Sequence, residues 1–391
     1  MADAMTRASS SNIDADEGWS LPAWTYSDPE FFALEIDRVF RPSWQVVCHE
    51  SDVANAGDYH TLDYIGESVV VIRGHDAVLR AFANVCRHRG SRLLDGASGC
   101  AKIIVCPYHA WTYNLDGTLR GIPLKESYGP LDIAKLGLAP IELETFQSFV
   151  FVRLKSGGPS VAEMMAPYLS EIAPYRFGDL RASGRVTLRP RNVNWKNVGD
   201  NYSDGLHIAV AHPGLKRLME EGYGVEAAEY VDKMWGPIVE RPSSNLSERA
   251  YQRFLPHVEH LPPERQRLWT YFKLWPNIAF DIYPDQVDFM QWLPVSPTEA
   301  LIREIPYVVP DDRREMKAAR YLNWRVNRQV NLEDTTLIGR VQAGMQSESF
   351  TVGPLSEKEV ALRNFCRRMR MLIPEAREHR PPAAGWSRKT P

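Results

Sequence analysis

The spacing of apolar residues changes character along the chain. After Asp28-Pro29, apolar side chains recur largely at helical spacing up to Phe40, and a proline suits the first turn of a helix. From Trp44 to about residue 154 the apolar runs are short and β-branched, such as Val69–Ile72 and Phe149–Val152, with turn residues between them. This pattern predicts an N-terminal helix followed by a compact antiparallel β domain.

The rest of the chain mixes helical and extended patterns. Gly157–Ser160 is the best candidate for a boundary between the β domain and this part. The elements that we expect after it are a strand at Arg191–Lys196, a helix at Asn197–Ala211, two strands in Trp269–Pro294 that meet at Tyr283-Pro284-Asp285, a helix at Arg313–Met345, and a last helix that starts at the capping box Ser356–Glu359.

Composition and charge exclude several classes of protein. Lys and Arg number 46 against 49 Asp and Glu, a net charge of −3, which argues against a nucleic-acid binder. No run approaches the ~20 apolar residues of a membrane span, and the polar, acidic N-terminus is no secretory signal. The five cysteines are odd in number and widely spread, which argues against a disulfide framework. We therefore expect a cytoplasmic protein that binds neither membranes nor nucleic acids, with a disordered tail over residues 1 to about 18.

Two short motifs, each with one cysteine and one histidine, indicate a metal site. Cys86-Arg87-His88 is followed, after 17 residues, by Cys106-Pro107-Tyr108-His109. A zinc finger would pair two cysteines in one motif and two histidines in the other. One cysteine and one histidine in each motif suits a [2Fe–2S] cluster in which two histidines replace two cysteines on one iron. Zinc is the alternative for the same four residues.

A carboxylate and two histidines follow within Asn194–His212. Asp204 and His207 are three residues apart and share a helix face. His212 lies five residues after His207, roughly 140° further round an ideal helix. The helix must therefore end or distort before His212, and Pro213-Gly214 supports an end. Two imidazoles and one carboxylate make the facial triad of non-haem Fe(II) oxygenases.

In this order and spacing, the two sets of residues resemble those of the ring-hydroxylating, Rieske non-haem iron oxygenases. Asn84-Val85, Arg89-Gly90 and Tyr108–Trp111 match as well, and the similarity extends from about residue 25 to 375. The resemblance implies the terminal oxygenase (α) subunit, with an α+β fold in three parts. These are residues 1–40, a tail and a helix packing on the catalytic domain; 41–156, an antiparallel β Rieske domain; and 157–391, a catalytic domain with an antiparallel sheet flanked by helices.

The resemblance also implies the ligands of the cluster. Cys86 and Cys106 bind one iron of the [2Fe–2S] centre, and His88 and His109 bind the other. Because neutral imidazoles carry less negative charge than thiolates, such a cluster has a higher potential than an all-cysteine ferredoxin.

By the same resemblance, His207 and His212 bind the mononuclear Fe(II). The third ligand comes from a late Glu-Asp segment in the family, which selects Asp334 here. Other carboxylates compete for this place, and they are Glu333, Asp281, Asp285, Asp288 and Asp200.

Asp204 has a bridging role in this comparison. In the family, an acidic residue at this place accepts hydrogen bonds from a cluster histidine and an iron-bound histidine across a subunit boundary. Carried over, this predicts contacts from His109 of one subunit to Asp204 of its neighbour and on to His207, and hence a homotrimer. Asn201, about one helical turn before Asp204, is a candidate for the lining of the iron pocket.

The resemblance implies an enzyme that uses O₂ and electrons from an NAD(P)H-dependent reductase, directly or through a ferredoxin, to hydroxylate or demethylate a small molecule. Leu274–Asn277 and Tyr283–Asp288 are similar to members that oxidise N-methylated or quaternary ammonium compounds, which suit an aromatic cage. An aromatic acid is the alternative substrate, and a non-catalytic Rieske electron carrier is the alternative protein. The aromatic residues considered for the pocket are Trp235, Trp269, Phe272, Trp275, Phe280, Tyr283, Phe289 and Trp292.

Overall fold

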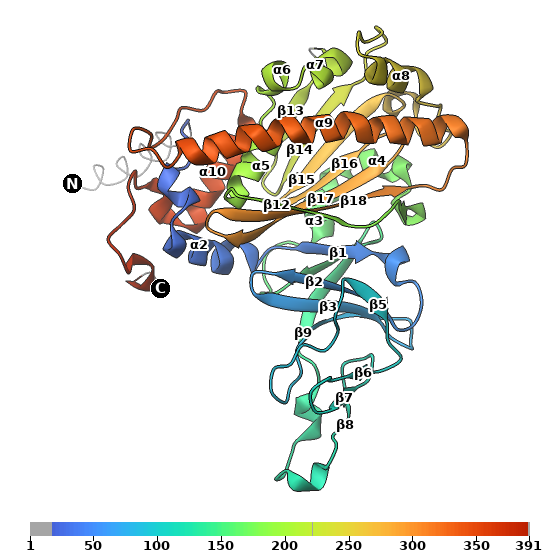
Figure 1. The fold of residues 1–391 in the computed structure, drawn as a ribbon, viewed down its shortest axis with the longest axis vertical. Coiled ribbons are helices and arrows are strands. Elements are labelled where there is room, and N and C mark those ends of the chain that lie inside the picture. Colours follow the sequence, from blue (N-terminus) through green and yellow to red (C-terminus); the bar gives the residue numbers. More distant parts are fainter. Residues whose placement is uncertain (1–17, 221, 390–391) are drawn as a thin grey trace, which may run out of the picture. The chain divides into compact units, whose positions relative to one another are not determined.

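The computed structural model describes residues 18–220 and 222–389, which form two compact units (Figure 1). The smaller unit comprises Arg41–Pro167 and Phe177–Ala182, so it continues past the boundary predicted at residue 156. The larger unit comprises residues 18–40, Tyr168–Arg176 and the chain from Ser183 onward. The predicted disordered tail lies outside the described residues, apart from Gly18.

The smaller unit is an antiparallel β structure, as predicted. Its main sheet has the strand order β1-β10-β9-β4-β3-β2-β5, and a second sheet has the order β6-β7-β8. Val69–Ile72, in the middle of the main sheet, is fully buried, which explains its unbroken apolar run. The strands are β1 (Gln45–His49), β2 (Asp58–Tyr64), β3 (Glu67–Arg73), β4 (Leu79–Ala83), β5 (Ser98–Cys100), β6 (Ile104–Val105), β7 (Thr112–Tyr113), β8 (Leu119–Gly121), β9 (Pro140–Phe146) and β10 (Phe149–Arg153), with the short β11 (Arg181–Ala182) and helix α3 (Val161–Met165) in the same unit.

The larger unit is built on an antiparallel sheet with the order β18-β17-β16-β15-β14-β13, and β12 pairs with β18. The aromatic segment forms three strands rather than the two predicted, because a turn at Trp275–Asn277 interrupts it before the predicted turn at Tyr283. The strands are β12 (Thr187–Arg191), β13 (Gly224–Ala227), β14 (Val231–Pro237), β15 (Leu268–Leu274), β16 (Ile278–Ile282), β17 (Val287–Ser296) and β18 (Glu299–Val308).

Helices pack against this sheet. Helix α9 crosses the strands (Figure 1), and α5 packs against α9, β17 and β18. No helix among the described residues is both long and apolar enough to cross a membrane. The helices of the unit are α2 (Pro29–Glu35), followed by a π-helical turn (Ile36–Phe40), and α4 (Leu169–Ile172), α5 (Trp195–Ser203), α6 (Ile208–Ala211), α7 (Pro213–Met219), α8 (Leu246–Phe254), α9 (Arg314–Gly344) and α10 (Val360–Leu372).

The helix boundaries follow local capping. The Asp28 side chain accepts a hydrogen bond from the Phe31 N–H at the start of α2, as the sequence suggests. The strand predicted at 191–196 is wrong, because Asn194 caps α5 by accepting a hydrogen bond from the Lys196 N–H at 2.9 Å. Glu359 accepts a bond from the Ser356 N–H, but α10 begins only after this turn.

A buried ion pair ties the N-terminal helix to α5. Lys196 Nζ lies 2.5 Å from Glu35 Oε1, and both side chains are fully buried. The Trp195 indole N–H also donates to Glu35, at 3.0 Å. This contact anchors the start of the helix that leads to the predicted iron ligands.

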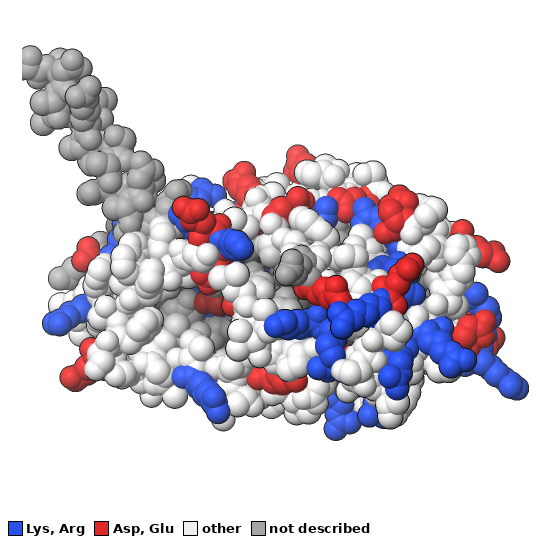
Figure 2. Space-filling model, turned by 90° about the horizontal axis from the view of Figure 1, so that it is seen from above, with Lys and Arg blue, Asp and Glu red and all other residues white. Residues whose placement is uncertain are grey.

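The surface of the molecule carries both signs of charge. On the face shown in Figure 2, acidic and basic side chains are interspersed, with Lys and Arg denser toward one end. This mixture matches the net charge of −3 and differs from the single-sign surface of a typical nucleic-acid binder.

Candidate metal centres and active-site cavity

A break in the chain after α5 brings the two predicted iron-binding histidines together. The helix predicted over 197–211 is not continuous, because α5 ends at Ser203 and Asp204 has an extended backbone (φ −82°, ψ 116°). His207 and His212 then stand at the N-termini of two new helices, α6 and α7. The break removes the angular offset that a straight helix would impose between the two rings.

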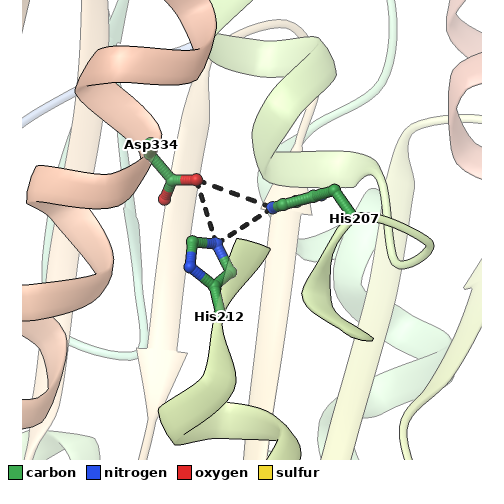
Figure 3. Close-up of side chains that lie close together, drawn as sticks. All are labelled: His207, His212 and Asp334. Carbon is green, nitrogen blue, oxygen red and sulfur yellow. Dashed lines mark hydrogen bonds and ion pairs between the residues drawn. The ribbon is translucent and has the colours of Figure 1, made fainter. Parts of the chain in front are cut away.

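His207, His212 and Asp334 point toward a common centre (Figure 3). The two Nε2 atoms lie 3.0 Å apart, and Asp334 Oδ1 lies 3.0 Å from His212 Nε2 and 3.5 Å from His207 Nε2. Metal–ligand bonds of about 2.1 Å at right angles place neighbouring ligand atoms about 3.0 Å apart. The three side chains therefore fit the facial triad of a mononuclear iron site.

Each histidine of this triad is held by a carboxylate on its far side. His207 Nδ1 lies 3.1 Å from Asp204 Oδ2, and His212 Nδ1 lies 2.8 Å from Glu333 Oε2. An Nδ1–H that donates to a carboxylate leaves Nε2 free for a metal and fixes the orientation of the ring. Glu333, which the sequence offered as a rival third ligand, is thus a partner of His212 instead.

The electrostatics of the triad favour a cation. Burial alone would lower the pKa of His207, but hydrogen bonds to Asp204 and Asp334 outweigh burial and raise that pKa to about 9. Burial alone would raise the pKa of Asp334, but hydrogen bonds from both histidines lower it to about 2. The site therefore holds positive charge strongly, and a divalent metal supplies such charge.

Asn201 and the remaining rival carboxylates take different places. The Asn201 amide donates to Asp334 Oδ1 at 3.1 Å and lies 3.4 Å from His207 Nε2, so this residue borders the triad. Asp200 accepts a hydrogen bond from Tyr26, and Asp285 accepts one from Tyr251. The last two rivals, Asp281 and Asp288, line the adjoining cavity without contacting the triad.

Replacing Glu333 by Gln is expected to weaken metal binding by roughly 10- to 100-fold, because the neutral amide holds the His212 ring but no longer raises its basicity. Competition between the protein and a chelator for Co²⁺ or Fe²⁺ measures this change. Glu348→Gln removes the same charge from an exposed position and serves as the control. Wild-type affinity in the Glu333 variant would contradict the assigned role.

The four predicted cluster ligands lie in two loops of the smaller unit with matching geometry. The Gly90 N–H donates to the Cys86 carbonyl at 3.1 Å, and the Ala110 N–H donates to the Cys106 carbonyl at 3.0 Å. The donor residues have positive φ values of 71° and 55°. In both loops the chain therefore turns back four residues after the cysteine. Gly90 adopts its positive φ at no steric cost, because glycine has no Cβ.

The side chains in these loops fit an iron–sulfur cluster. Cys86 and Cys106 are 3% and 2% exposed, and the His88 and His109 rings lie 4.6 Å apart. The Nδ1 atoms of both histidines are buried without a hydrogen-bond partner among the described residues. An unmet buried polar atom costs about 1–3 kcal/mol, so two such atoms beside two buried thiols point to a missing ligand.

The acidity of the second cysteine agrees with this fit. Burial would raise the pKa of the Cys106 thiol, but hydrogen bonds from the backbone N–H groups of His109 and Tyr108 and from Cys86 lower it overall. A lowered thiol pKa favours the thiolate, which is the form that binds iron.

A cavity of about 110 Å³ opens beside the histidine–aspartate triad. Tyr283 is the one residue of the eight predicted aromatic candidates that lines it. Trp269 and Trp292 are fully buried in the core instead. Sequence reasoning missed several lining residues, among them three further tyrosines and a carboxylate of the sheet, which are Tyr202, Tyr223, Tyr271 and Glu304.

Comparisons with known proteins match two family models to this chain. The family model of the ring hydroxylating alpha subunit (catalytic domain) matches residues 177–375, and that of the Rieske [2Fe–2S] domain matches residues 43–146. The carnitine monooxygenase oxygenase subunit of Acinetobacter pittii (strain PHEA-2) is 31% identical over 86% of this chain and 87% of its own length. The corresponding Escherichia coli (strain K12) subunit is 42% identical over 221 residues, which span only 56% of each chain.

A solved structure is similar over nearly the whole chain. The quaternary ammonium Rieske monooxygenase CntA, in complex with L-carnitine, has a TM-score of 0.75 and 26% identity. The match covers 94% of this chain and 97% of that one.

Proposed function

Because the chain belongs to the ring-hydroxylating oxygenase alpha subunits, we propose that it oxidises a small N-methylated ammonium compound with O₂. The observation that supports this substrate class is the cavity beside the triad, in which tyrosine rings and carboxylates surround the space next to His207 and His212. Aromatic faces and carboxylates both attract a quaternary ammonium group.

Family membership confirms several predictions from the sequence. The α+β fold, with a Rieske domain followed by a catalytic domain, is confirmed, as are the [2Fe–2S] and mononuclear iron cofactors. The catalytic-domain match excludes the non-catalytic electron carrier, and the Rieske match excludes the zinc alternative.

We assign the roles of individual residues as follows. His207, His212 and Asp334 hold the mononuclear iron, which supplies the activation of O₂ with electrons from the cluster. Asn201 holds the Asp334 carboxylate by a hydrogen bond, and Asp204 orients the His207 ring. The cluster itself is held by Cys86, His88, Cys106 and His109.

The proposed reaction inserts one oxygen atom into a C–H bond of a carbon bonded to nitrogen. The second oxygen atom leaves as water, with two electrons from the reductase and two protons. The resulting hydroxylated ammonium compound loses its hydroxyl proton and breaks its C–N bond, the bonding electrons going to nitrogen, to yield an amine and an aldehyde. Relatives named carnitine and glycine betaine monooxygenase subunits carry out oxidations of this substrate class. An aromatic acid fits less well, because its carboxylate would face the carboxylates of the cavity.

The proposed partners follow from what the sequence contains. It has no G-x-G-x-x-G motif for a dinucleotide, so we assign electron supply to a separate NAD(P)H-dependent reductase, directly or through a ferredoxin. Asp204 lies on His207 and, in a homotrimer, would also reach His109 of a neighbouring subunit. We place the protein in the cytoplasm, where the reductase finds NAD(P)H.

The test is turnover by the holoenzyme with a reductase of this class and NADH. L-carnitine, glycine betaine and benzoate are compared, and products are followed by mass. Release of an amine and an aldehyde from an ammonium compound is the expected result. Oxidation of benzoate alone would contradict the substrate class while leaving the oxygenase assignment intact.

A further inference from the structure

Three carboxylates gather on the sheet wall of the active-site cavity. Asp281 in β16 is paired directly with Asp288 in β17, and Glu304 in β18 is paired with Met290, two residues beyond Asp288. Paired residues, and residues two apart on a strand, lie on the same face of a sheet. All three carboxylates line the cavity beside the triad. Like charges directly opposite one another on antiparallel strands are destabilising, so this arrangement calls for a compensating charge.

The protein supplies little of that charge. Asp281 accepts hydrogen bonds from the neutral Tyr202 and Tyr283 hydroxyls, and Asp288 accepts one from the neutral Gln286 amide at 2.7 Å. Among the described residues, only Glu304 of the three carboxylates has a cationic partner, which is Arg189. Asp288 is 8% exposed, so its carboxylate is largely removed from solvent.

The acidity of these groups reflects the same imbalance. Burial raises the pKa of Asp281 to about 7. Burial raises the pKa of Asp288 well above its usual value, and the charges of Glu304 and Asp281 raise it further. Each group therefore binds a proton more readily than usual, and a cationic ligand can take the place of that proton.

A larger cavity of about 630 Å³ adjoins this one and has the opposite charge. The two cavities share Asp288, Glu304, Asn327 and Asn331, so their boundary is lined by two carboxylates and two neutral amides. Five arginines line the larger cavity, and they are Arg185, Arg189, Arg191, Arg320 and Arg328.

Several of these guanidinium groups contact neutral groups rather than carboxylates. Arg320 donates to backbone carbonyls, and Arg328 lies over the Trp324 ring, 5.3 Å from its centre. Burial and the neighbouring charge of Arg189 lower the pKa of Arg191. Within the part of the chain that the structure describes, neither Arg191 nor Arg328 is paired with a carboxylate. An anion in this cavity would relieve the repulsion between Arg189 and Arg191 and would give Arg328 a counter-charge.

Because carboxylates line the inner cavity and arginines line the outer one, we propose that the two cavities bind a dipolar substrate in a single orientation. Its ammonium group lies in the inner cavity against Asp288, and its acid group lies in the outer cavity near Arg191 and Arg328. This inference rests on the proposed function and adds the charge and direction of the bound molecule. The orientation presents the carbons bonded to nitrogen to the iron side of the cavity. It also keeps the acid group away from Asp281 and Asp334, which line only the inner cavity.

The test uses three ligands that share one carbon skeleton. γ-Butyrobetaine carries both charges, its methyl ester lacks the acid charge, and 5,5-dimethylhexanoate replaces the nitrogen by carbon and lacks the cationic charge. Affinities for the iron-loaded enzyme, without reductase, are measured by calorimetry. We expect γ-butyrobetaine to bind roughly tenfold tighter than either analogue, the ratio that about 1.4 kcal/mol produces.

Variants assign each preference to one cavity. In Asp288→Asn, the affinities for γ-butyrobetaine and 5,5-dimethylhexanoate should differ by no more than about threefold. The preference for γ-butyrobetaine over its methyl ester should stay unchanged. Arg191→Gln combined with Arg328→Gln should do the reverse. Asp285→Asn is the matched control, because Asp285 is buried in the turn just before β17, accepts a hydrogen bond from Tyr251, and lines neither cavity.

The outcomes separate this inference from the proposed function. Equal affinity of the wild type for all three ligands, or binding of none, would overturn the proposed orientation. So would an Asp288→Asn variant that still prefers γ-butyrobetaine over 5,5-dimethylhexanoate as strongly as the wild type does. Turnover of an N-methylated compound to amine and aldehyde would still support the proposed function in each case. Thermal unfolding of every variant checks folding, and the single arginine variants replace the double one if it unfolds.

Discussion

Replacing Asp334 by Ala should remove one iron per chain and abolish turnover, while the optical spectrum of the [2Fe–2S] cluster stays unchanged. Asp334 supplies the one oxygen atom of the three converging ligand atoms, Oδ1, and its neighbours are two imidazole nitrogens. Loss of an outer carboxylate costs about 10- to 100-fold in metal affinity, so loss of a ligand should cost more than about 100-fold.

Iron content after gel filtration measures this effect directly. Cys106→Ser serves as the complementary variant, since it should disturb the cluster spectrum and leave Co²⁺ binding at the mononuclear site intact. Glu348→Ala, at an exposed position, controls for the loss of an acidic residue. A full complement of iron in Asp334→Ala would show that another carboxylate completes the site.

Replacing Lys196 by Met should lower the free energy of unfolding by about 3–5 kcal/mol, because it leaves the Glu35 carboxylate buried without its cation. Burial raises the pKa of Glu35 and lowers that of Lys196, so it disfavours the charged form of both groups, and each is the counter-charge of the other at 2.5 Å. Denaturant unfolding of the iron-loaded protein gives the value.

The pH dependence and a double variant distinguish this cause from lost packing. Without Lys196, the folded-state pKa of Glu35 stands still further above its unfolded value, so the carboxyl takes up a proton as the pH falls. The penalty should therefore be smaller at pH 5 than at pH 8. Lys196→Met combined with Glu35→Leu should recover most of the loss, since an apolar pair often replaces a buried ion pair without cost. No recovery in the double variant would contradict the explanation.

The candidate metal sites could be recognised in the sequence from residue types and their spacing. Cysteine and histidine are scarce, and few structures other than a metal site use them at the spacing of Cys86, His88, Cys106 and His109. The need for a break before His212 also followed from helix geometry alone. The position of that break did not follow from the sequence. Asn194 caps α5 earlier than the sequence pattern indicated, and α5 already ends at Ser203.

What the sequence by itself determined was therefore the class of chemistry and the order of the domains, and it also supplied the ligands that we propose for each metal. Only the tertiary structure decided which neighbouring carboxylate faces which histidine. Glu333 and Asp334 are adjacent in the chain, and their separate contacts depend on how α9 lies over α6 and α7. The tyrosines and carboxylates that line the cavity could likewise not be predicted from the sequence. Strand register pairs Asp281 with Asp288 and turns Tyr271 to the cavity. Register and packing arise from contacts distant in sequence, which local patterns of residues do not contain.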